Sequence, residues 1–574
     1  MAWYDEAVFY HIYPLGMLGA PKDNDYGEPV HRLRELDEWI EHIANTGFNA
    51  IYIGPLFESV GHGYETTDYK KLDSRLGDND DLKAFVKKCH GKNIRVVFDG
   101  VFNHTGRDFF AFRDIVQNRE NSPYRDWYCN VNFYGNNEYN DGFSYDNWGG
   151  YNLLAKLNQR NTEVKNYICD VIRFWVSEFD VDGIRLDAAD VLDFDFMKTL
   201  RSVANEVKPD FWLMGEVIHG DYTRWVNEGT LHCVTNYALH KAFYSGHNDH
   251  NYFEIAHTVK RLYDMGGNRP DGLRLYNFVD NHDVERIFTK LNNKAHFVPV
   301  HILLYSLPGI PSVYYGSEFG IEGKKEKFSD ASLRPALRYE DYSDAAENNS
   351  YTRLIAALGR IRNSVKILSY GDYREITLTN RQFMFARQMN GRAVIVVVNN
   401  DEAAAVVNGR GLPDGNYTGA LSGNRYSVCG GNISVEVPAA SGDILVPEDL
   451  DGMPEIERVV DDNPVEEVIN DKPVGEVTEA ADTVKNESGE PVVEEMELLP
   501  DGAGKKYGID AKYDKYNPDE LRTRTDYENM CVEELQVAIL EKMSGNGYVD
   551  SQMIKSVMDN VYEDSLRNWV KSFR

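Results

Sequence analysis

Ile94-Arg-Val-Val-Phe-Asp-Gly-Val101 and Val181-Asp-Gly-Ile-Arg-Leu-Asp187 are two strand candidates, each with an aspartate at or near its end. Six further strand candidates precede residue 317: Ala7–Tyr13, Phe48–Pro55, Phe211–Val217, Cys233–Tyr237, Leu273–Val279 and Pro311–Gly316. Helical patterns separate most of them, for example Leu33–Thr46, Asp81–His90, Val164–Phe179 and Phe194–Val207. Eight such βα units predict an α/β fold, a (β/α)8 TIM barrel rather than an open doubly wound sheet.

The barrel is predicted to occupy residues 1–104 and 161–370, with an interruption after its third strand. The intervening segment 105–160 is too long for a βα loop and is rich in Asn, Gly, Tyr and Trp. It is predicted to form a small inserted domain beside the barrel mouth. Residues 371–447 show short alternating strands with glycine turns, which predict a C-terminal antiparallel β-sandwich.

The end of the chain has a different composition. Residues 448–499 hold eighteen Asp and Glu against three Lys and Arg, and no aromatic residue. Such a segment cannot bury enough apolar surface to fold, so residues 448–505 are predicted to form an acidic, flexible linker. Residues 506–574 then show two amphipathic patterns, which predict a small helical module. One pattern runs through Val532, Leu535, Ile539 and Met543, and the other starts near Ser551 and carries Ile554, Met558, Val561, Trp569 and Phe573.

Charge and composition exclude several classes of protein. The net charge of −31 disfavours nucleic acid and anionic membranes as partners. No apolar run approaches the ~18 residues of a membrane span, and the first residues do not resemble a secretory signal. The six cysteines lie far apart without a CxxC pair, which predicts reduced thiols in a cytoplasmic protein. The tail leaves a protein partner possible, and the sequence leaves the oligomeric state open.

Four carboxylates follow the predicted barrel strands: Asp99, Asp187, Glu216 and Asp283. In a barrel the carboxyl ends of all strands meet at one mouth. Asp187 and Glu216 end neighbouring strands, ~4.8 Å apart in the sheet. Their carboxyl groups are therefore expected near the ~5–5.5 Å separation that suits double displacement at a glycosidic carbon. Any one of these carboxylates could instead only cap the backbone or form an ion pair with Arg185. Four carboxylates on one rim of the barrel favour a catalytic role.

Four segments resemble, in order, the signature segments of the α-amylase family, glycoside hydrolase family 13: Asp99-Gly-Val-Phe-Asn-His104, Gly183-Ile-Arg-Leu-Asp187, Gly215-Glu216-Val and Phe278-Val-Asp-Asn-His-Asp283. The resemblance covers roughly residues 5–447. It implies that Asp187 is the nucleophile, Glu216 the general acid/base and Asp283 the transition-state stabiliser. It also implies that Arg185, His104 and His282 contact the sugar in subsite −1. Because Arg185 shares a strand face with Asp187, it is expected to hold that carboxylate ionised.

Other segments extend the resemblance. Tyr64, in Gly61-His-Gly-Tyr64-Glu-Thr-Thr-Asp68-Tyr, matches the tyrosine that stacks under the −1 sugar, and Asp330 and Arg334 match the pair that binds its far hydroxyls. Leu154-Ala-Lys-Leu-Asn158 is similar to a segment of the neopullulanase, cyclomaltodextrinase and maltogenic amylase branch, and the protein is expected to differ from that branch by lacking its N-terminal domain. No cofactor is expected to be required. Asp23-Asn-Asp25 is a candidate site for Ca²⁺, with a polar turn as the alternative.

Three functions fit these residues. The first is a retaining hydrolase that cleaves α-1,4-glucosidic bonds of maltodextrins, cyclodextrins or starch oligosaccharides. The second is a glucanotransferase or an α-1,6-acting glucosidase on the same fold. The third, a non-catalytic carbohydrate-binding or scaffold protein, is disfavoured by the intact Asp187, Glu216 and Asp283.

Overall fold

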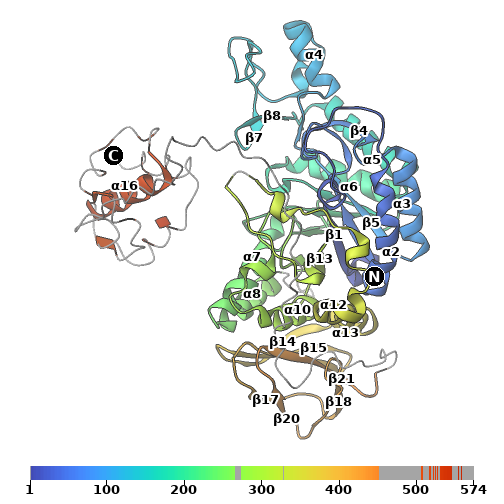
Figure 1. Ribbon diagram of the computed structural model, residues 1–574, viewed down its shortest axis with the longest axis vertical. Coiled ribbons are helices and arrows are strands. Elements are labelled where there is room, and N and C mark those ends of the chain that lie inside the picture. Colours follow the sequence, from blue (N-terminus) through green and yellow to red (C-terminus); the bar gives the residue numbers. More distant parts are fainter. Residues whose placement is uncertain are drawn as a thin grey trace, which may run out of the picture. The chain divides into compact units, whose positions relative to one another are not determined.

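Eight parallel strands form the centre of the computed structural model (Figure 1), which describes residues 2–265, 273–327 and 329–450, α16 and scattered residues around it between 506 and 570. The sheet order is β11-β10-β9-β5-β2-β1-β13-β12, and a parallel bridge between Thr235 and Tyr276 links its two ends. The predicted TIM barrel is therefore confirmed. Its strands are β1 (Phe9–Ile12), β2 (Ala50–Ile53), β5 (Arg95–Gly100), β9 (Gly183–Leu186), β10 (Trp212–Gly215), β11 (Cys233–Val234), β12 (Tyr276–Phe278) and β13 (Ile310–Tyr314).

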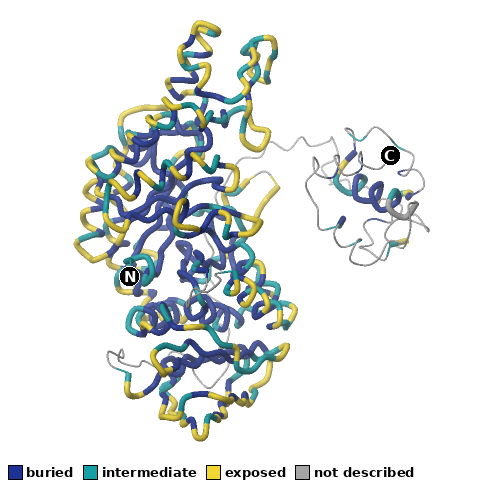
Figure 2. Tube along the Cα trace, turned by 180° about the vertical axis from the view of Figure 1, so that it is seen from behind, coloured by how far each residue is buried: buried dark blue, intermediate teal, exposed yellow. Residues whose placement is uncertain are grey.

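Amphipathic helices cover the outside of the barrel. Asp78, Asn161, Asp193 and Asn349 accept hydrogen bonds from backbone N–H groups at the starts of α3, α5, α6 and α12, which gives each of these helices a defined N-terminus. The inner faces of α3, α5 and α6 are buried and their outer faces exposed (Figure 2), as the 3.6-residue period requires, whereas α12 is buried over most of its length. The main helices are α2 (Leu36–Asn45), α3 (Asn79–Gly91), α5 (Thr162–Phe179), α6 (Phe194–Val207), α7 (Tyr237–Asn248), α8 (Tyr252–Met265), α10 (Phe297–Ser306) and α12 (Ser350–Ser364).

The chain between β5 and α5 leaves the barrel and returns to it. It contains β6 (His104–Thr105), α4 (Phe110–Asn118), β7 (Asn147–Trp148) and β8 (Tyr151–Lys156), which project from one end of the barrel in Figure 1. β8 pairs antiparallel with both β6 and β7, and His104 lies opposite Lys156. This pairing anchors the projecting segment directly beside the end of β5. A further hairpin, β3 (Phe57–Ser59) with β4 (Thr66–Leu72), carries a loop at the same end.

An antiparallel structure follows the barrel. Its larger sheet has the order β14-β15-β16-β21-β18-β19, and β17 and β20 form a separate pair. The predicted C-terminal antiparallel fold is confirmed. One face packs on α10, where the Arg387 guanidinium donates to the Ser306 carbonyl at 2.8 Å. The strands are β14 (Asp372–Leu378), β15 (Gln382–Met389), β16 (Arg392–Asn399), β17 (Ala405–Arg410), β18 (Gly415–Gly419), β19 (Arg425–Val428), β20 (Asn432–Val437) and β21 (Ser441–Pro447).

The chain divides into two compact units, residues 1–469 and 470–574. In the second unit α16 (Val532–Gly545) lies where the apolar period predicts a helix, and Leu535 and residues 537–540 on it are fully buried. The predicted acidic linker lies outside the described residues from 451 to 505, and the second predicted helix lies largely outside them. No helix in the described part of the chain is long and apolar enough to cross a membrane.

We expect a chain that ends after Leu450 to fold without the second unit, because the barrel core and the antiparallel sheet are complete within residues 2–450. Its melting temperature should stay within about 3 °C of the full-length value. In a chain of this size a shift of a few degrees corresponds to a change of ~1 kcal/mol in the free energy of unfolding. Limited proteolysis of the full chain should cut first between 450 and 500. An unfolded truncated chain would show that the second unit supports the barrel.

Candidate active site

One guanidinium group binds three carboxylates inside the barrel mouth. Nη1 of Arg185 lies 2.8 and 3.0 Å from the two oxygens of Asp99 and 2.9 Å from Oδ1 of Asp187. Nη2 of the same residue lies 2.8 Å from Oε2 of Glu216. All four residues are largely or fully enclosed, with the Arg185 side chain only 3% exposed. Three of the predicted strand-end carboxylates therefore meet on one buried cation.

The two-residue period of the strands places these groups in the barrel interior. Asp99 lies two residues after Val97, and Glu216 lies two residues after Met214, whose side chains fill the interior. Asp99 pairs with Arg185, and Arg185 pairs with Met214, so the residues lie side by side across three strands. The backbone ladder continues past the strands, because Asp187 N–H donates to Gly100 O and Glu216 N–H to Leu186 O.

A glycine on β9 makes room for this arrangement. A Cβ atom on Gly183 would lie 2.7 Å from the Trp212 carbonyl oxygen and 2.9 Å from the Trp212 Cβ, closer than real Cβ contacts. Trp212 is fully buried below the carboxylates. Glycine at 183 thus lets β9 and β10 approach while a large indole fills the barrel beneath the site.

Asp283 comes to the mouth on a loop rather than on a strand. β12 ends at Phe278, and the Asn281 side chain accepts from the N–H groups of Asp283 and Val284, which turns the chain. Asp283 then contacts Nε2 of His282 at 3.0 Å and Nη2 of Arg334 at 2.9 Å. The same Arg334 nitrogen lies 3.2 Å from Asp330.

Tyr64 joins the two groups of charges. Its hydroxyl lies 2.5 Å from Nε2 of His282 and 3.3 Å from Oδ2 of Asp99, and its ring stacks on His282 at 14°. His104 lies beside the Tyr64 main chain, and its buried Nε2 has no hydrogen-bond partner among the described residues. The structure thus gathers all nine predicted catalytic and substrate-binding residues at one end of the barrel.

Three residues at this site, Tyr52, His11 and Tyr237, were not predicted from the sequence. Tyr52 donates to Asp99 at 2.8 Å, and His11 stacks on Tyr52 with ring centres 4.3 Å apart. The Tyr237 hydroxyl lies 3.4 Å from Oε1 of Glu216 and accepts from Asn281. His11 and Tyr52 lie two residues after interior-facing Phe9 and Ala50, so the strand period was a signal that could have found them.

The pKa of Asp187 differs from the sequence-based expectation. Burial raises its pKa well above the ordinary value, Arg185 opposes this, and the neighbouring charges of Glu216 and Asp99 add to the rise. Arg185 was expected to hold Asp187 ionised, but its single charge is shared among three carboxylates. Burial and the two neighbouring carboxylates therefore outweigh Arg185, and the pKa of Asp187 rises instead of falling.

The pKa of Asp283 is shifted in the opposite direction. Burial would raise its pKa, but the charge and hydrogen bond of His282 and the charges of Arg334 and Arg185 hold it well below the ordinary value. Burial lowers the pKa of His104 to about 3, so that its imidazole is neutral at pH 7. The mouth therefore contains one firmly ionised carboxylate, Asp283, beside a buried cluster in which the pKa of Asp187 is raised.

The candidate calcium loop is held by a protein cation. Asp23 and Asp25 are exposed, and Asp25 accepts from the Gly27 N–H in a turn. Beneath them the buried Arg75 guanidinium donates to the carbonyl oxygens of Pro21 and Lys22, both at 2.9 Å, and to Asp73. Carbonyl and carboxylate oxygens are the ligands that Ca²⁺ takes, and here the guanidinium binds them. The described contacts do not bring Asp23 and Asp25 onto one cation, so Ca²⁺ here stays a prediction.

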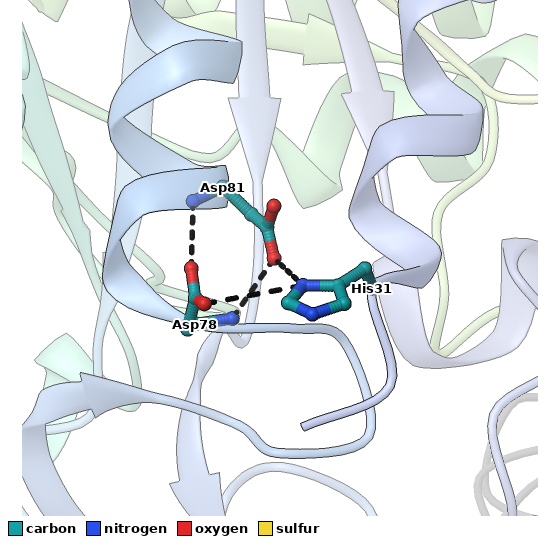
Figure 3. Close-up of side chains that lie close together, drawn as sticks. All are labelled: His31, Asp78 and Asp81. Atoms are coloured by element: carbon teal, nitrogen blue, oxygen red, sulfur yellow. Dashed lines mark hydrogen bonds and ion pairs between the residues drawn. The ribbon is translucent and has the colours of Figure 1, made fainter. Parts of the chain in front are cut away.

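Figure 3 shows another group of possible metal ligands, His31, Asp78 and Asp81. Asp78 and Asp81 exchange side-chain and backbone hydrogen bonds at the start of α3, a capping box. Asp81 also binds His31 and the Arg34 guanidinium. These partners already neutralise Asp81, so this group serves to fix the helix end.

Known proteins share this arrangement of elements. Residues 32–353 match the family model of the alpha-amylase catalytic domain. A cyclomaltodextrinase from Thermoanaerobacter pseudethanolicus is 30% identical over 429 residues, which cover 71% of this chain and 72% of that protein. An intracellular maltogenic amylase from Bacillus subtilis is 26% identical over 419 residues, 69% of each chain. The native Nostoc punctiforme debranching enzyme has a TM-score of 0.66 and 26% identity, covering 77% of this chain and 98% of that one.

Two isosteric substitutions should shift the melting temperature at pH 7 in opposite directions. Asp187→Asn removes a buried carboxyl whose pKa is raised, and Arg185 keeps two partners, so we expect a rise of about 1–3 °C. Asp283→Asn leaves Arg334 and His282 without their carboxylate, so we expect a fall of a few degrees. Thermal unfolding of both variants beside Asp126→Asn, an exposed aspartate, measures this.

The pH dependence fixes the sign of each effect. Above pH ~3.9, the ordinary pKa of an aspartate, Asp187 destabilises the fold because its pKa is raised in the folded state. Asp283 stabilises the fold in the same pH range because its pKa is lowered in the folded state. Below about pH 4 the Asp187→Asn gain should vanish, and the Asp283→Asn loss should shrink as the pH falls further. Shifts of the same sign at pH 7 would contradict the assignment of these charges.

Proposed function

We propose, because this chain belongs to the α-amylase family of glycoside hydrolases, that it cleaves α-1,4-glucosidic bonds of maltodextrins and cyclodextrins with retention of configuration. The substrate class rests on relatives named cyclomaltodextrinase and maltogenic amylase. The stereochemistry rests on the geometry of the barrel mouth, and the α-1,4 linkage rests on the four family signature segments. The shared guanidinium of Arg185 is the observation that carries the proposal.

This guanidinium supports a short distance between the two reacting carboxylates. Asp187 and Glu216 bind adjacent terminal nitrogens of one flat group, at 2.9 and 2.8 Å. Inverting enzymes need ~6.5–9.5 Å between their carboxyl groups to admit a water molecule, whereas retaining enzymes use ~5–5.5 Å. A pair held on one guanidinium suits the shorter value. Asp187 is then the nucleophile and Glu216 the general acid/base.

The steps follow from these positions. Asp187 attacks the anomeric carbon, and Glu216 gives its proton to the oxygen of the leaving sugar as the glycosidic bond breaks. Water then enters, gives a proton to Glu216 and attacks the same carbon, which frees Asp187 and releases a product with the α configuration.

The remaining groups bind the sugar and stabilise charge. Asp283, ionised through His282 and Arg334, faces the positive charge that develops at the ring. The orphan Nε2 of His104 donates to or accepts from a sugar hydroxyl. Asp330 and Arg334 bind the far hydroxyls, and the Tyr64 ring provides an apolar face.

A second candidate is an α-1,6-acting enzyme or a glucanotransferase on the same site. The likeness to a debranching enzyme favours it, and water and a sugar acceptor compete for the same intermediate. Products from maltotriose, pullulan and β-cyclodextrin separate the candidates. Glucose and maltose from maltotriose support hydrolysis of α-1,4 bonds, and longer products support transfer.

We place this enzyme in the cytoplasm. All six cysteines are free thiols, and a relative carries the name intracellular maltogenic amylase. A reducing compartment keeps such thiols free.

Removing one catalytic group at a time should abolish turnover without unfolding the protein. Asp187→Asn, Glu216→Gln and Asp283→Asn should each lower kcat on maltotriose at least a hundredfold, because positioned acid–base groups contribute ~10²–10⁴. Asp195→Asn and Glu228→Gln, which change exposed carboxylates of the same barrel, are the matched controls. A folded variant that keeps more than about a tenth of the parent rate would refute the role of its residue.

The product anomer tests retention directly. Proton NMR of a fresh maltotriose or β-cyclodextrin digest should show the α-anomeric signal first, before mutarotation adds the β-anomer. A β-anomer that appears first would make Asp187 a base for water, and the double-displacement assignment would fail.

A further inference from the structure

A buried histidine on β1 takes no part in the reaction steps above. His11 lies two residues after Phe9, which fills the barrel interior, so its side chain points inward as well. The sheet register places His11 beside Tyr52 and Tyr52 beside Val97, two residues before Asp99. His11 is 3% exposed. It therefore lies in the barrel interior, below the carboxylates of the mouth, where substrate does not reach it.

The imidazole of His11 contacts the supports of both charged groups in the mouth. On one side it stacks on Tyr52 at 23°, with ring centres 4.3 Å apart, and Tyr52 donates to Asp99 at 2.8 Å. On another side it meets the ring of His282 at 89°, with centres 5.2 Å apart, and Nε2 of His282 contacts Asp283 at 3.0 Å. One ring on β1 thus touches a residue that binds Asp99 and a residue that binds Asp283.

Packing alone does not account for a histidine at this position. Its Nε2 is buried and has no hydrogen-bond partner in the part of the chain that the structure describes. A buried polar atom without a partner destabilises the fold, and a phenylalanine ring would fill a similar space without that cost. The adjacent ring of His282 is in the same position, because its buried Nδ1 also has no partner among the described residues. Two contacting imidazoles therefore each hold one unused nitrogen.

The charge state of His11 suits a hydrogen bond to His282. Burial lowers the pKa of His11 well below the ordinary value, so its ring is neutral at pH 7. A neutral imidazole has one N–H donor and one acceptor nitrogen, so His11 can supply the group that Nδ1 of His282 lacks. Hydrogen bonds in catalytic sites often close only when substrate binds. The charged and titratable groups that act on His11 come from β9 and from the chain after β12: Arg185, His282, Asp283 and Arg286.

We propose that His11 is a positioning residue for the reaction, whose polar ring orients His282 toward Asp283 and holds Tyr52 on Asp99. The proposal rests on the proposed function for the reaction that it serves. Burial would raise the pKa of Asp283, and the charge and hydrogen bond of His282 come first among the groups that lower it. A change at His11 that frees His282 should therefore weaken the charge that faces the transition state, while the sugar contacts of the mouth remain.

Kinetics of the full-length protein on maltotriose separates an orienting role from simple packing. His11→Phe keeps a flat ring and removes the nitrogens, so kcat should fall about tenfold or more, with KM within about threefold of the parent value. Its melting temperature at pH 7 should rise by about 1–3 °C, because a buried nitrogen without a partner is removed. His11→Gln, whose amide supplies a donor and an acceptor, should recover most of kcat. Tyr10→Phe, which removes a hydrogen bond to Glu318 from the outward face of the same strand, is the matched control and should lower the melting temperature with kcat unchanged. His11→Leu replaces His11→Phe if the larger ring prevents folding.

Thermal unfolding measures the same contact without turnover. Asp283→Asn should lower the melting temperature of the parent by a few degrees, and by less than about half as much in the His11→Phe background, because His282 already holds Asp283 less firmly there. A folded apolar variant with the parent kcat, or equal effects of Asp283→Asn in both backgrounds, would overturn the proposal. A parent that hydrolyses no glucan while the effects stay unequal would instead refute the proposed function and leave the orienting role of His11 standing.

Discussion

The buried guanidinium of Arg185 holds the reaction centre together. Removing an arginine from water is costly, and the cost is offset only when charged partners satisfy its N–H groups. Asp99, Asp187 and Glu216 do so from three neighbouring strands, and no single strand could supply them all. The barrel is thus the scaffold that the ion cluster needs, because only strand ends that converge can place three carboxylates on one cation.

The same cluster shifts the pKa of a reacting carboxyl and lowers the stability of the folded barrel. Three carboxyl groups share one positive charge, and burial together with the charges of Glu216 and Asp99 raises the pKa of Asp187. On the other side of the mouth, Arg334 and His282 keep Asp283 ionised. The pKa values of two carboxyls in one mouth are therefore shifted in opposite directions by their different surroundings. Tyr64 contacts both groups and links them.

Much of the fold and of the site could be predicted from sequence, because strands and their terminal residues are local features. Asp99, Asp187 and Glu216 were predicted from their places after strand-like runs, and each of those runs is a barrel strand. Asp283 was harder to place, since it stands five residues beyond β12 and depends on the Asn281 turn and on Arg334. The strand period could have placed His11 and Tyr52 in the barrel interior, whereas Tyr237 follows β11 and reaches Glu216 through long-range packing that no local pattern reveals. The direction of the Asp187 pKa shift was misjudged because its burial and the number of carboxylates on Arg185 are properties of the folded barrel alone.

Trapping the covalent intermediate tests the central claim that Asp187, which Arg185 positions through an ion pair, is the nucleophile. The full-length Glu216→Gln enzyme, treated with an α-glucosyl fluoride that carries fluorine at C5, should accumulate a glycosyl ester because its breakdown lacks the general base. Peptide mass spectrometry should then find one added 5-fluoroglucosyl group on Asp187, and none in the Asp187→Asn protein. A label on Asp99 or Asp283, or no label while hydrolysis of the fluoride continues, would contradict the account.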